Sequence, residues 1–312
     1  MLTRGYDGRW RSTSQRQRGG GPGKGEKLQK IVLCHLESLV GLPALNILFA
    51  HLGPRIGLVL ASHRFGPHHG SVTEQLREGV RRSGWRLTVW LGFDIFAAQT
   101  VSQVARWISF IRRESPALAT LPELARRHGA RFAQVRDVND AASIDLVRAY
   151  APDLVIVLNF DQILRAQFIA LPRLGVINVH PSLLPSLRGP CPAYWALQER
   201  RDVSGVSVHL IEDEKIDSGT LIVQSEVIVD RSLSVGELTT RLFELGARAL
   251  PQAIATLTSN REVGRHQDLT KGAYRGFPDR RAMAASRRQG VRLCRLGHIV
   301  RLVAAATGLA RW

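Results

Sequence analysis

Short apolar runs alternate with amphipathic stretches along most of this 312-residue chain. Such runs are typical of strands that are buried on both faces. They predict strands at Lys30–Leu36, Ile56–Ser62, Arg131–Val135, Asp153–Asn159, Gly175–His180, Gly205–Ile211 and Thr220–Val229. Apolar residues at helical spacing predict helices at Val72–Ser83 (Leu76 and Val80 facing inward), Leu121–His128, Ala141–Ala151 and Val235–Thr258. Strands that alternate with helices predict an α/β fold, a mostly parallel sheet with helices on both faces.

One segment interrupts this alternation. Trp85–Ile111 is long, apolar and aromatic, and its only charged residues are Arg86, Asp94 and Arg106. It begins like a strand and ends like a helix, so we expect a strand followed by a core helix. A lid or a helix on a membrane surface is the alternative.

The net charge of +17 is concentrated at the two ends of the chain. Residues 1–30 have a net charge of +6, residues 261–312 have +9, and the remaining residues have only +2. We therefore predict a disordered basic extension over 1–28 and one domain over 29–260, with an apolar insert at about 85–111. A short, basic, largely helical tail follows over 261–312. Basic tails suit a nucleic acid or a membrane surface, and solvated tails that aid solubility are the plain alternative.

Cysteine usage and hydropathy bear on where the protein works. Three widely separated cysteines do not suit a disulfide scaffold, and no apolar run is long enough for an ordinary transmembrane helix. The N-terminal segment has no apolar core of the kind a secretory signal needs. We expect a cytoplasmic protein, with peripheral contact to a membrane as the open alternative. His63, His68 and His69 lack companions at metal-ligand spacing, so no metal is expected.

The densest chemical pattern is GVINVHPSLLPSLRGPCPAYWAL, which begins at Gly175. Asn178 and His180 lie two apart at the end of a predicted strand, so their side chains share one face. The carboxyl ends of parallel strands are where open α/β sheets place their sites. Either residue alone would suggest a turn or a core position, but the pair followed by a Pro- and Gly-rich loop indicates a functional site.

A second pattern, GVSVHLIEDEKIDSGTLIVQ, begins at Gly205. It places His209 on a strand and Asp217 in a loop that leads back to the sheet edge. Asp217 could there meet His180, whereas the acidic run before it is expected to be solvated.

Together the two blocks resemble the folate-dependent formyltransferases, a family that includes glycinamide ribonucleotide, methionyl-tRNA and sugar-amine formyltransferases. The resemblance covers roughly residues 30–260. It implies the formyltransferase fold, a Rossmann-like sheet, and 10-formyltetrahydrofolate as the formyl donor. It also implies that Asn178, His180 and Asp217 are the catalytic trio. Further residues carried over from the family pattern are the folate-pocket candidates Leu158, Gln162 and Ile163, and the supporting residues Ser182, Arg188, Gly189 and His209.

The chemistry of formyl transfer suits the implied trio. An amine that attacks the formyl carbon creates an oxyanion, which needs preorganised hydrogen-bond donors. The amide of Asn178 cannot lose its N–H groups by titration, and neutral His180 can accept the amine proton. Asp217 would raise the pKa of His180 and relay a proton through water. His209 is expected to support the site rather than to act as a fourth catalyst.

The acceptor is left open by the sequence. The stretch from His35 to Gly41 contains a carboxylate and no phosphate-binding nest, which disfavours purine synthesis. Residues 260–312 are too short and too helical for the β domain of methionyl-tRNA enzymes. We expect a primary amine of an amino sugar or another specialised metabolite.

Three other functions stay open beside this one. They are a formyltetrahydrofolate hydrolase, a methionyl-tRNA formyltransferase-like enzyme, and a non-catalytic relative that binds RNA through the basic tails. The hydrolase usually has an N-terminal regulatory domain, and residues 1–28 cannot form one. The pathway and the oligomeric state are not indicated by the sequence.

Overall fold

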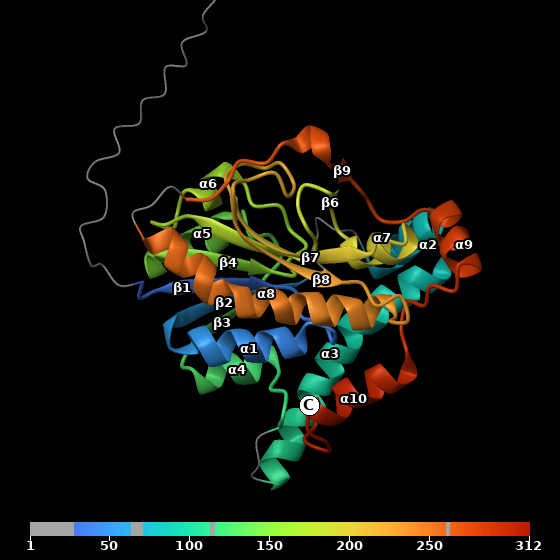
Figure 1. The fold of residues 1–312 in the computed structure, drawn as a ribbon. Helices are drawn as coiled ribbons and strands as arrows, with labels where there is room; N and C mark the ends of the chain where they lie inside the picture. Colours follow the sequence, from blue (N-terminus) through green and yellow to red (C-terminus); the bar gives the residue numbers. More distant parts are fainter. Residues whose placement is uncertain (1–27, 64–70, 113–115, 260–262) are drawn as a thin grey trace, which may run out of the picture.

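The apolar runs form the strands of a single mixed sheet in the computed structural model, which describes residues 28–63, 71–112, 116–259 and 263–312. The strand order across this sheet is β3-β2-β1-β4-β5-β7-β8 (Figure 1). The first five strands in the chain run parallel, and β7 and β8 are antiparallel additions at one edge. The strands are β1 (Ile31–His35), β2 (Ile56–Ser62), β3 (Arg131–Val135), β4 (Leu154–Leu158), β5 (Val176–His180), β7 (Val203–Ile211) and β8 (Leu221–Ile228).

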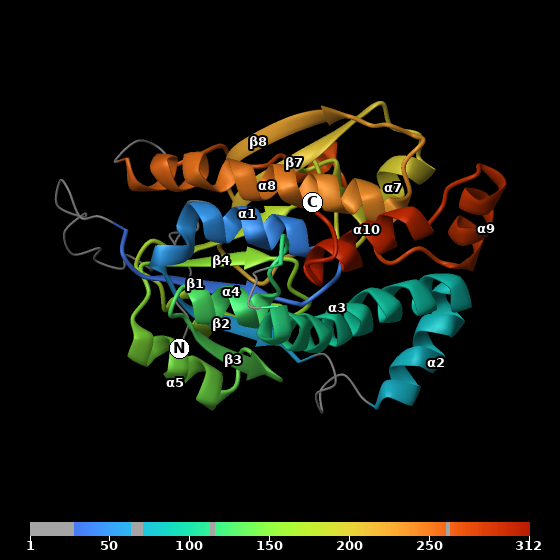
Figure 2. The same cartoon turned by 90° about the horizontal axis from the view of Figure 1, so that it is seen from below.

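Helices cover both faces of the sheet, which confirms the predicted α/β architecture. Alternation along β1 sends Ile31 and Leu33 into one apolar cluster and Val32 and Cys34 into the other. The first face is covered by α1 (Leu42–Leu52), α4 (Leu121–Arg127) and α8 (Val235–Thr258), and the second by α5 (Ala141–Tyr150) and α6 (Ala166–Ile169) (Figure 2). Short 3₁₀ helices lie at Gly53–Arg55 and Leu269–Lys271.

The long helix α8 fixes the strands that bear the predicted site. It begins with a capping box in which Ser234 and Glu237 satisfy each other's backbone N–H groups. At Gly246 a Cβ atom would lie 2.3 Å from a methyl group of Val179 and 2.9 Å from one of Val206. Because this position has no side chain, the helix can lie directly on β5 and β7.

The apolar insert is one helix, α3 (Trp85–Arg112), so the prediction of a strand at its start was wrong. Leu87, Trp90, Ala98 and Val101 recur at helical spacing and are buried, which outweighs the strand preference of its first residues. The preceding helix α2 (Val72–Ser83) has the predicted bounds. Its Leu76 was expected to face inward but is 45 % exposed.

The chain after α8 wraps around the predicted site loop. A short strand β9 (Ala273–Tyr274) pairs with β6 (Leu187–Arg188) inside that loop. The helices that follow are α9 (Arg280–Arg288), which packs near α7 (Pro192–Gln198), and α10 (Leu296–Ala306), which lies beside α3 (Figures 1 and 2). The predicted extension over 1–28 falls almost wholly outside the described residues.

Candidate active site

The candidate site lies at the carboxyl ends of the parallel strands. Asn178 and His180 project from the same face of β5 because they are two residues apart. Strand β7 pairs antiparallel with β5 and places His209 directly opposite Asn178. Asn159 and Leu36, which follow β4 and β1, line the same cleft. The topology therefore collects polar groups from three neighbouring strands at one edge of the sheet.

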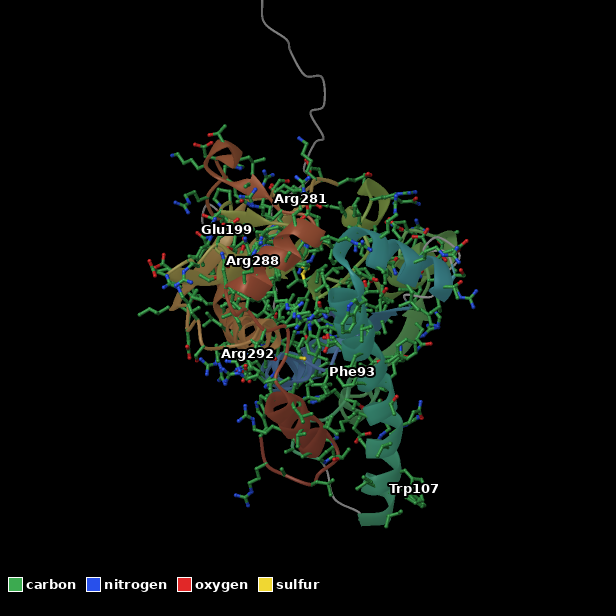
Figure 3. All side chains as sticks on the ribbon, turned by 90° about the vertical axis from the view of Figure 1, so that its right-hand side faces the viewer. Phe93, Trp107, Glu199, Arg281, Arg288 and Arg292 are labelled. Carbon is green, nitrogen blue, oxygen red and sulfur yellow. The ribbon has the colours of Figure 1, made fainter. Side chains whose placement is uncertain are left out.

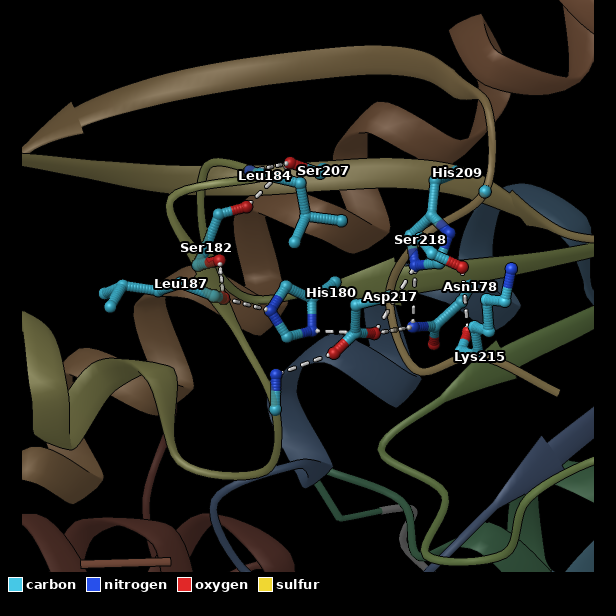
Figure 4. Close-up of polar contacts among 12 residues, drawn as sticks. Asn178, His180, Ser182, Leu184, Leu187, Ser207, His209, Lys215, Asp217 and Ser218 are labelled. Carbon is cyan, nitrogen blue, oxygen red and sulfur yellow. Dashed lines mark hydrogen bonds and ion pairs between the residues drawn. The ribbon is translucent and has the colours of Figure 1, made fainter. Parts of the chain in front are cut away.

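The carboxylate of Asp217 joins these side chains into one cluster (Figure 4). Its Oδ1 atom lies 3.3 Å from His180 Nδ1 and accepts a hydrogen bond from Asn178 Nδ2 at 3.3 Å. Oδ1 also lies 3.6 Å from His209 Nε2. Asp217 has φ of 52°, a conformation that Asp and Asn tolerate better than most residues. The three residues that the sequence predicted to act together are therefore in direct contact.

Hydrogen bonding fixes which nitrogen of His180 carries the proton. The Nε2 atom lies 2.8 Å from the carbonyl oxygen of Leu187, and a carbonyl can only accept. Nε2 is therefore the protonated nitrogen, and Nδ1 is the nitrogen that titrates. Nδ1 faces Asp217, at the position where a proton taken from a substrate would be stabilised.

Burial and charge set the ionisation of this pair in opposite directions. Burial lowers the pKa of His180, and the charge of Asp217 offsets this only in part. Burial alone would raise the pKa of Asp217, but His180 and His209 hold it at about 2. At neutral pH the site therefore contains an anionic carboxylate beside a neutral imidazole that can accept a proton.

The amide of Asn178 has both of its N–H groups engaged. One donates to His209 Nε2 at 3.1 Å, and the other donates to Asp217 at 3.3 Å. His209 is oriented for this role because its Nδ1–H donates to the carbonyl oxygen of Leu210 at 2.8 Å. The longer of the two Asn178 bonds is the one that a substrate oxygen could replace most easily.

The loop after β5 is held by hydrogen bonds that the sequence did not reveal. Ser207 Oγ accepts from the Leu184 N–H at 2.9 Å and donates to the Ser182 carbonyl at 2.7 Å. Gln224 Nε2 donates to the Leu184 carbonyl and to Ser207 Oγ, both at 2.9 Å. The hydroxyl of Ser182 donates to the Leu187 carbonyl at 2.6 Å, beside His180. These contacts fix the carbonyl that orients the histidine.

Gly189 and Arg188 lie where the loop meets the C-terminal segment. The Gly189 N–H donates to Asp217 Oδ2 at 2.8 Å. Gly189 has φ of 109°, and a Cβ atom there would lie 2.3 Å from the carbonyl oxygen of Arg275, so only glycine fits. Arg188 lies in β6, paired with Tyr274.

Gln267 is a positioning residue that the sequence reasoning missed. Its Nε2 donates to the carbonyl oxygens of Asp217, at 3.2 Å, and Gly219, at 2.7 Å. The loop that presents the carboxylate is therefore tied to the chain after α8. No local sequence signal links two segments that are 50 residues apart.

A cleft of about 440 Å³ opens beside the cluster. One wall is formed by the loop after β4, where Ile163 is 53 % exposed. Gln162 also lines the cleft, but its side chain is occupied: Nε2 donates to Ser62 Oγ at 2.9 Å, and Oε1 accepts from the Val138 N–H at 2.7 Å. Gln162 thus holds this loop in place.

Leu158 does not line the cleft, although the sequence suggested it as a pocket residue. It is 1 % exposed and belongs to the apolar cluster on the other face of the sheet. Val157 pairs with Asn178 and faces the cleft instead. A shift of one residue along a strand reverses the face to which a side chain points.

No group of three or more His, Cys, Asp or Glu side chains within the described residues is placed to hold a metal ion. Of the three histidines noted in the sequence, His63 lies at the end of β2, and His68 and His69 lie outside the described residues.

Asp94 is a buried carboxylate at the far end of the cleft. It lies on α3, is 8 % exposed, and its Oδ1 accepts from the Val40 N–H at 3.0 Å. Burial raises its pKa to about 7, despite the hydrogen bonds from the backbone. The carboxylate thus accepts the hydrogen bond of a backbone N–H in the loop that precedes α1.

We expect Asp94→Asn to make the stability of the protein less sensitive to pH. The folded-state pKa of Asp94 exceeds its ordinary value. The free energy of unfolding therefore falls as pH rises from about 4 to 7, and Asp94 causes no further fall above that range. Between pH 5 and pH 8 the free energy of unfolding should fall by about 2–3 kcal/mol less in the variant than in the unmodified protein.

Urea denaturation at the two pH values measures this difference. Asp145→Asn, at an exposed position on α5, is the matched control and should behave like the unmodified protein. An equal fall in all three proteins would show that Asp94 is not buried as an ionisable group.

Comparison with known proteins adds independent information on this site. The model of the family described as formyl transferase matches residues 94–254. The chain is 31% identical to a methionyl-tRNA formyltransferase of Clostridioides difficile over 156 residues, which is 49% of this chain and 50% of the relative. It is 34% identical to the methionyl-tRNA formyltransferase of Bacillus licheniformis over 152 residues, 49% of this chain and 48% of the relative. The chain spans about half the length of the curated relatives it matches.

Among solved structures, the fold is similar to glycinamide ribonucleotide transformylase 1 from Symbiobacterium toebii. The TM-score is 0.50 at 20% sequence identity, over 77% of this chain and 93% of that one. The family match includes β5, β7 and the Asp217 loop, so the cluster lies within the part of the chain that the family shares.

Proposed function

Because this chain belongs to the formyl transferase family, we propose that it transfers a formyl group from 10-formyltetrahydrofolate to a primary amine. The observation on which this rests is the contact among Asn178, His180 and Asp217 at the edge of an open cleft. Each of the three provides one function that formyl transfer requires: an oxyanion donor, a proton acceptor and a charge that supports the acceptor.

His180 is the proposed general base. Its Nδ1 is the unprotonated nitrogen at neutral pH, and it accepts the proton that the amine loses as the new C–N bond forms. Asp217, fixed 3.3 Å away, stabilises the resulting imidazolium. Because the imidazolium can then return a proton to the departing nitrogen, no covalent link to the protein is needed.

Asn178 is the proposed donor to the formyl oxygen. Negative charge develops on that oxygen during attack, and the Asn178 N–H that now faces Asp217 can turn to it. His209 retains its hydrogen bond to the same amide and so keeps the group oriented. A preorganised donor of this kind stabilises the transition state more than the ground state.

The cleft suits a folate co-substrate. When bound, 10-formyltetrahydrofolate supplies an activated formyl group on a nitrogen atom. The wall formed by Phe160, Ile163 and Leu164 offers apolar side chains to a flat ring, and the polar cluster lines the same cleft. A mixed lining of this type is typical of small-molecule sites.

Charge within the cleft favours an acceptor without a phosphate close to its amine. Leaving aside Asp94, whose pKa burial raises to about 7, the carboxylates among the described lining residues outnumber the cations: they are Asp161, Asp213, Glu214 and Asp217, against Lys215. The Val40 N–H, which could otherwise help to bind an anion, is already occupied by Asp94. We therefore favour the amine of an amino sugar or of another specialised metabolite.

A second candidate acceptor is methionyl-tRNA. It is favoured by the names of the relatives that match about half of this chain. A hydrolase would use the same cluster with water in place of the amine, and an RNA-binding relative would use the basic segments without turnover.

The deciding experiment offers the protein 10-formyltetrahydrofolate with a panel of amino sugars, other small amines and methionyl-tRNA. Mass spectrometry should show the addition of one formyl group to an acceptor, together with stoichiometric release of tetrahydrofolate. Formate release without any acceptor would indicate a hydrolase. Absence of turnover with salt-sensitive RNA binding would indicate the non-catalytic relative.

Asp217→Asn tests the electrostatic role of the carboxylate while preserving its shape and its left-handed backbone. Without the negative charge, the pKa of His180 should fall further, so the acidic limb of the pH–rate profile should move to lower pH. Turnover should fall about tenfold or more, because the imidazolium that forms during the reaction loses the charge that stabilises it.

The control for this change is Asp145→Asn, at an exposed position on α5. Steady-state rates between pH 5 and pH 9 are measured for both variants. If the Asp217→Asn protein kept an unchanged pH–rate profile and an unchanged rate, Asp217 would have only a structural role in its turn.

A further inference from the structure

The outer face of α3 carries a stripe of exposed apolar side chains, which Thr100 and Gln103 interrupt near its middle. Trp85, Trp107 and Phe110 are 66 %, 69 % and 84 % exposed. Further exposed residues at spacings of three, four or eight are Val89, Phe93, Phe96, Val104 and Ile111. These spacings place all of them on one side of the helix, opposite the buried Leu87, Trp90 and Val101. A helix of 28 residues extends the stripe over ~40 Å.

A helix that is apolar on both faces is normally covered on both faces. The inner face of α3 packs on the body of the protein, so the outer face indicates an interaction surface. The only acidic residue of α3 is Asp94, and it is buried. No helix among the described residues is long and apolar enough to cross a membrane.

A strongly basic segment lies beside this stripe. Residues 280–312, here called the arginine arm, contain eight arginines and no acidic residue. Figure 3 shows Arg281, Arg288 and Arg292 of the arm to one side of α3, and Trp107 at the far end of that helix. The arm meets the stripe at the start of α3, where Trp85 lines one hollow with Arg280 and Arg287. Ile299 of α10 packs on the buried side of α3, against Leu87 and Trp90. Glu199, the acidic residue labelled on this side, is engaged by Arg201 and Arg275.

A hollow of about 310 Å³ lies where the start of α3 meets α9. Its charged lining residues are Arg86, Arg280 and Arg287, with no carboxylate among the lining residues that the structure describes. Arg280 is held in place by donating to the Val80 carbonyl through Nε and Nη2. The hollow is thus a cationic recess at one end of the apolar stripe.

We propose that the α3 stripe and the arginine arm bind the surface of an anionic lipid bilayer. The aromatic side chains of α3 enter the region between headgroups and acyl chains, where tryptophan is favoured. The arginines meet lipid phosphates, and the recess accommodates one headgroup. Each basic residue near an anionic surface contributes ~1 kcal/mol, so several together give reversible binding.

Two other occupants fit the observations less well. A second copy of the chain would bring two arginine arms, each without a carboxylate, toward one another. RNA would satisfy the arginines but would leave the apolar stripe exposed to water. Of these three occupants, an anionic bilayer complements both the charge and the hydrophobicity of α3 and the arginine arm.

The test is co-sedimentation of the full chain with vesicles of phosphatidylcholine alone, or of phosphatidylcholine mixed with the anionic lipid phosphatidylglycerol. The protein should bind only the anionic vesicles, and binding should weaken as salt is raised. Phe93→Ser with Trp107→Ser, and separately Arg281→Gln with Arg288→Gln, should each lower the partition coefficient ~10-fold or more.

Ile228→Ser is the matched control, because Ile228 is 82 % exposed and lies on β8, outside both α3 and the arginine arm. It should leave binding unchanged, and thermal unfolding of every variant checks that it is folded. Equal binding to both vesicle types, no binding, or binding that survives both double variants would overturn the proposal. A dimer seen in sedimentation velocity and dissociated by Trp107→Ser would also overturn it. So would binding to RNA that is lost only in the arginine double variant. None of these readouts depends on formyl transfer.

Discussion

Replacement of His180 by alanine is expected to lower the turnover number for formyl transfer by ~10²–10⁴-fold, the usual contribution of a positioned general base. The imidazole is the group in contact with Asp217 whose lone pair can accept a proton at neutral pH. Because alanine removes the proton acceptor but not the cleft, KM for the co-substrate should change much less than kcat. Initial rates with the acceptor found by the mass-spectrometric screen provide the measurement.

His180 is buried, so the alanine variant needs a check that it is folded. His180→Gln serves as a second variant, because its side-chain amide can still donate toward the Leu187 carbonyl without acting as a base. Both variants should unfold within a few degrees of the unmodified protein, whereas His51→Ala, at an exposed position on α1, should retain full activity. If either His180 variant kept a near-normal rate while folded, the general-base assignment would be wrong.

Local sequence patterns were sufficient to predict the sheet and the members of the polar cluster. The strand containing Asn178 and His180 ends at His180, just before Pro181, and the side-chain period of two places both residues on one face. The loop that carries Asp217 leads back to the same sheet edge, and the resemblance to a family added its catalytic role. The structure places that carboxylate 3.3 Å from His180, as the reasoning required.

The supporting contacts could not be predicted because they join distant segments. Gln267 reaches the Asp217 loop across 50 residues, and Gln224 reaches the Leu184 carbonyl across 40. Neither glutamine lies in a motif that signals its partner. The prediction that Leu158 lines the pocket was wrong for a different reason. The sequence pattern located the strand, but only the pairing register shows that Val157 shares the face of Asn178.

The start of α3 shows how tertiary packing outweighs local preference. Its first residues, Trp85 to Trp90, include the aromatic and β-branched types that favour strands. In the structure Leu87 and Trp90 pack on Val40 in a small apolar cluster, which only a helix allows from that spacing.

Replacement of Asn178 by alanine is expected to lower kcat by ~10²–10³-fold, the typical cost of removing one oxyanion donor. The variant loses the N–H that can turn from Asp217 to the formyl oxygen. It also leaves His209 Nε2 without its donor, so some loss of stability should accompany the loss of rate. Asn178→Asp should be equally inactive, because a second carboxylate beside Asp217 repels negative charge on the substrate oxygen.

Asn46→Ala distinguishes a catalytic amide from a structural one. Asn46 links α1 to the segment before α4, donating to the Ala119 carbonyl and accepting from the Ala119 N–H, each at 2.9 Å. Its removal should lower the melting temperature by several degrees and leave kcat unchanged, because no part of it reaches the cleft. Rates and thermal unfolding measured on both variants then separate the two roles. If Asn178→Ala lost only stability, as Asn46→Ala is expected to do, the stabilisation of the formyl oxygen would have to be assigned to His180 alone.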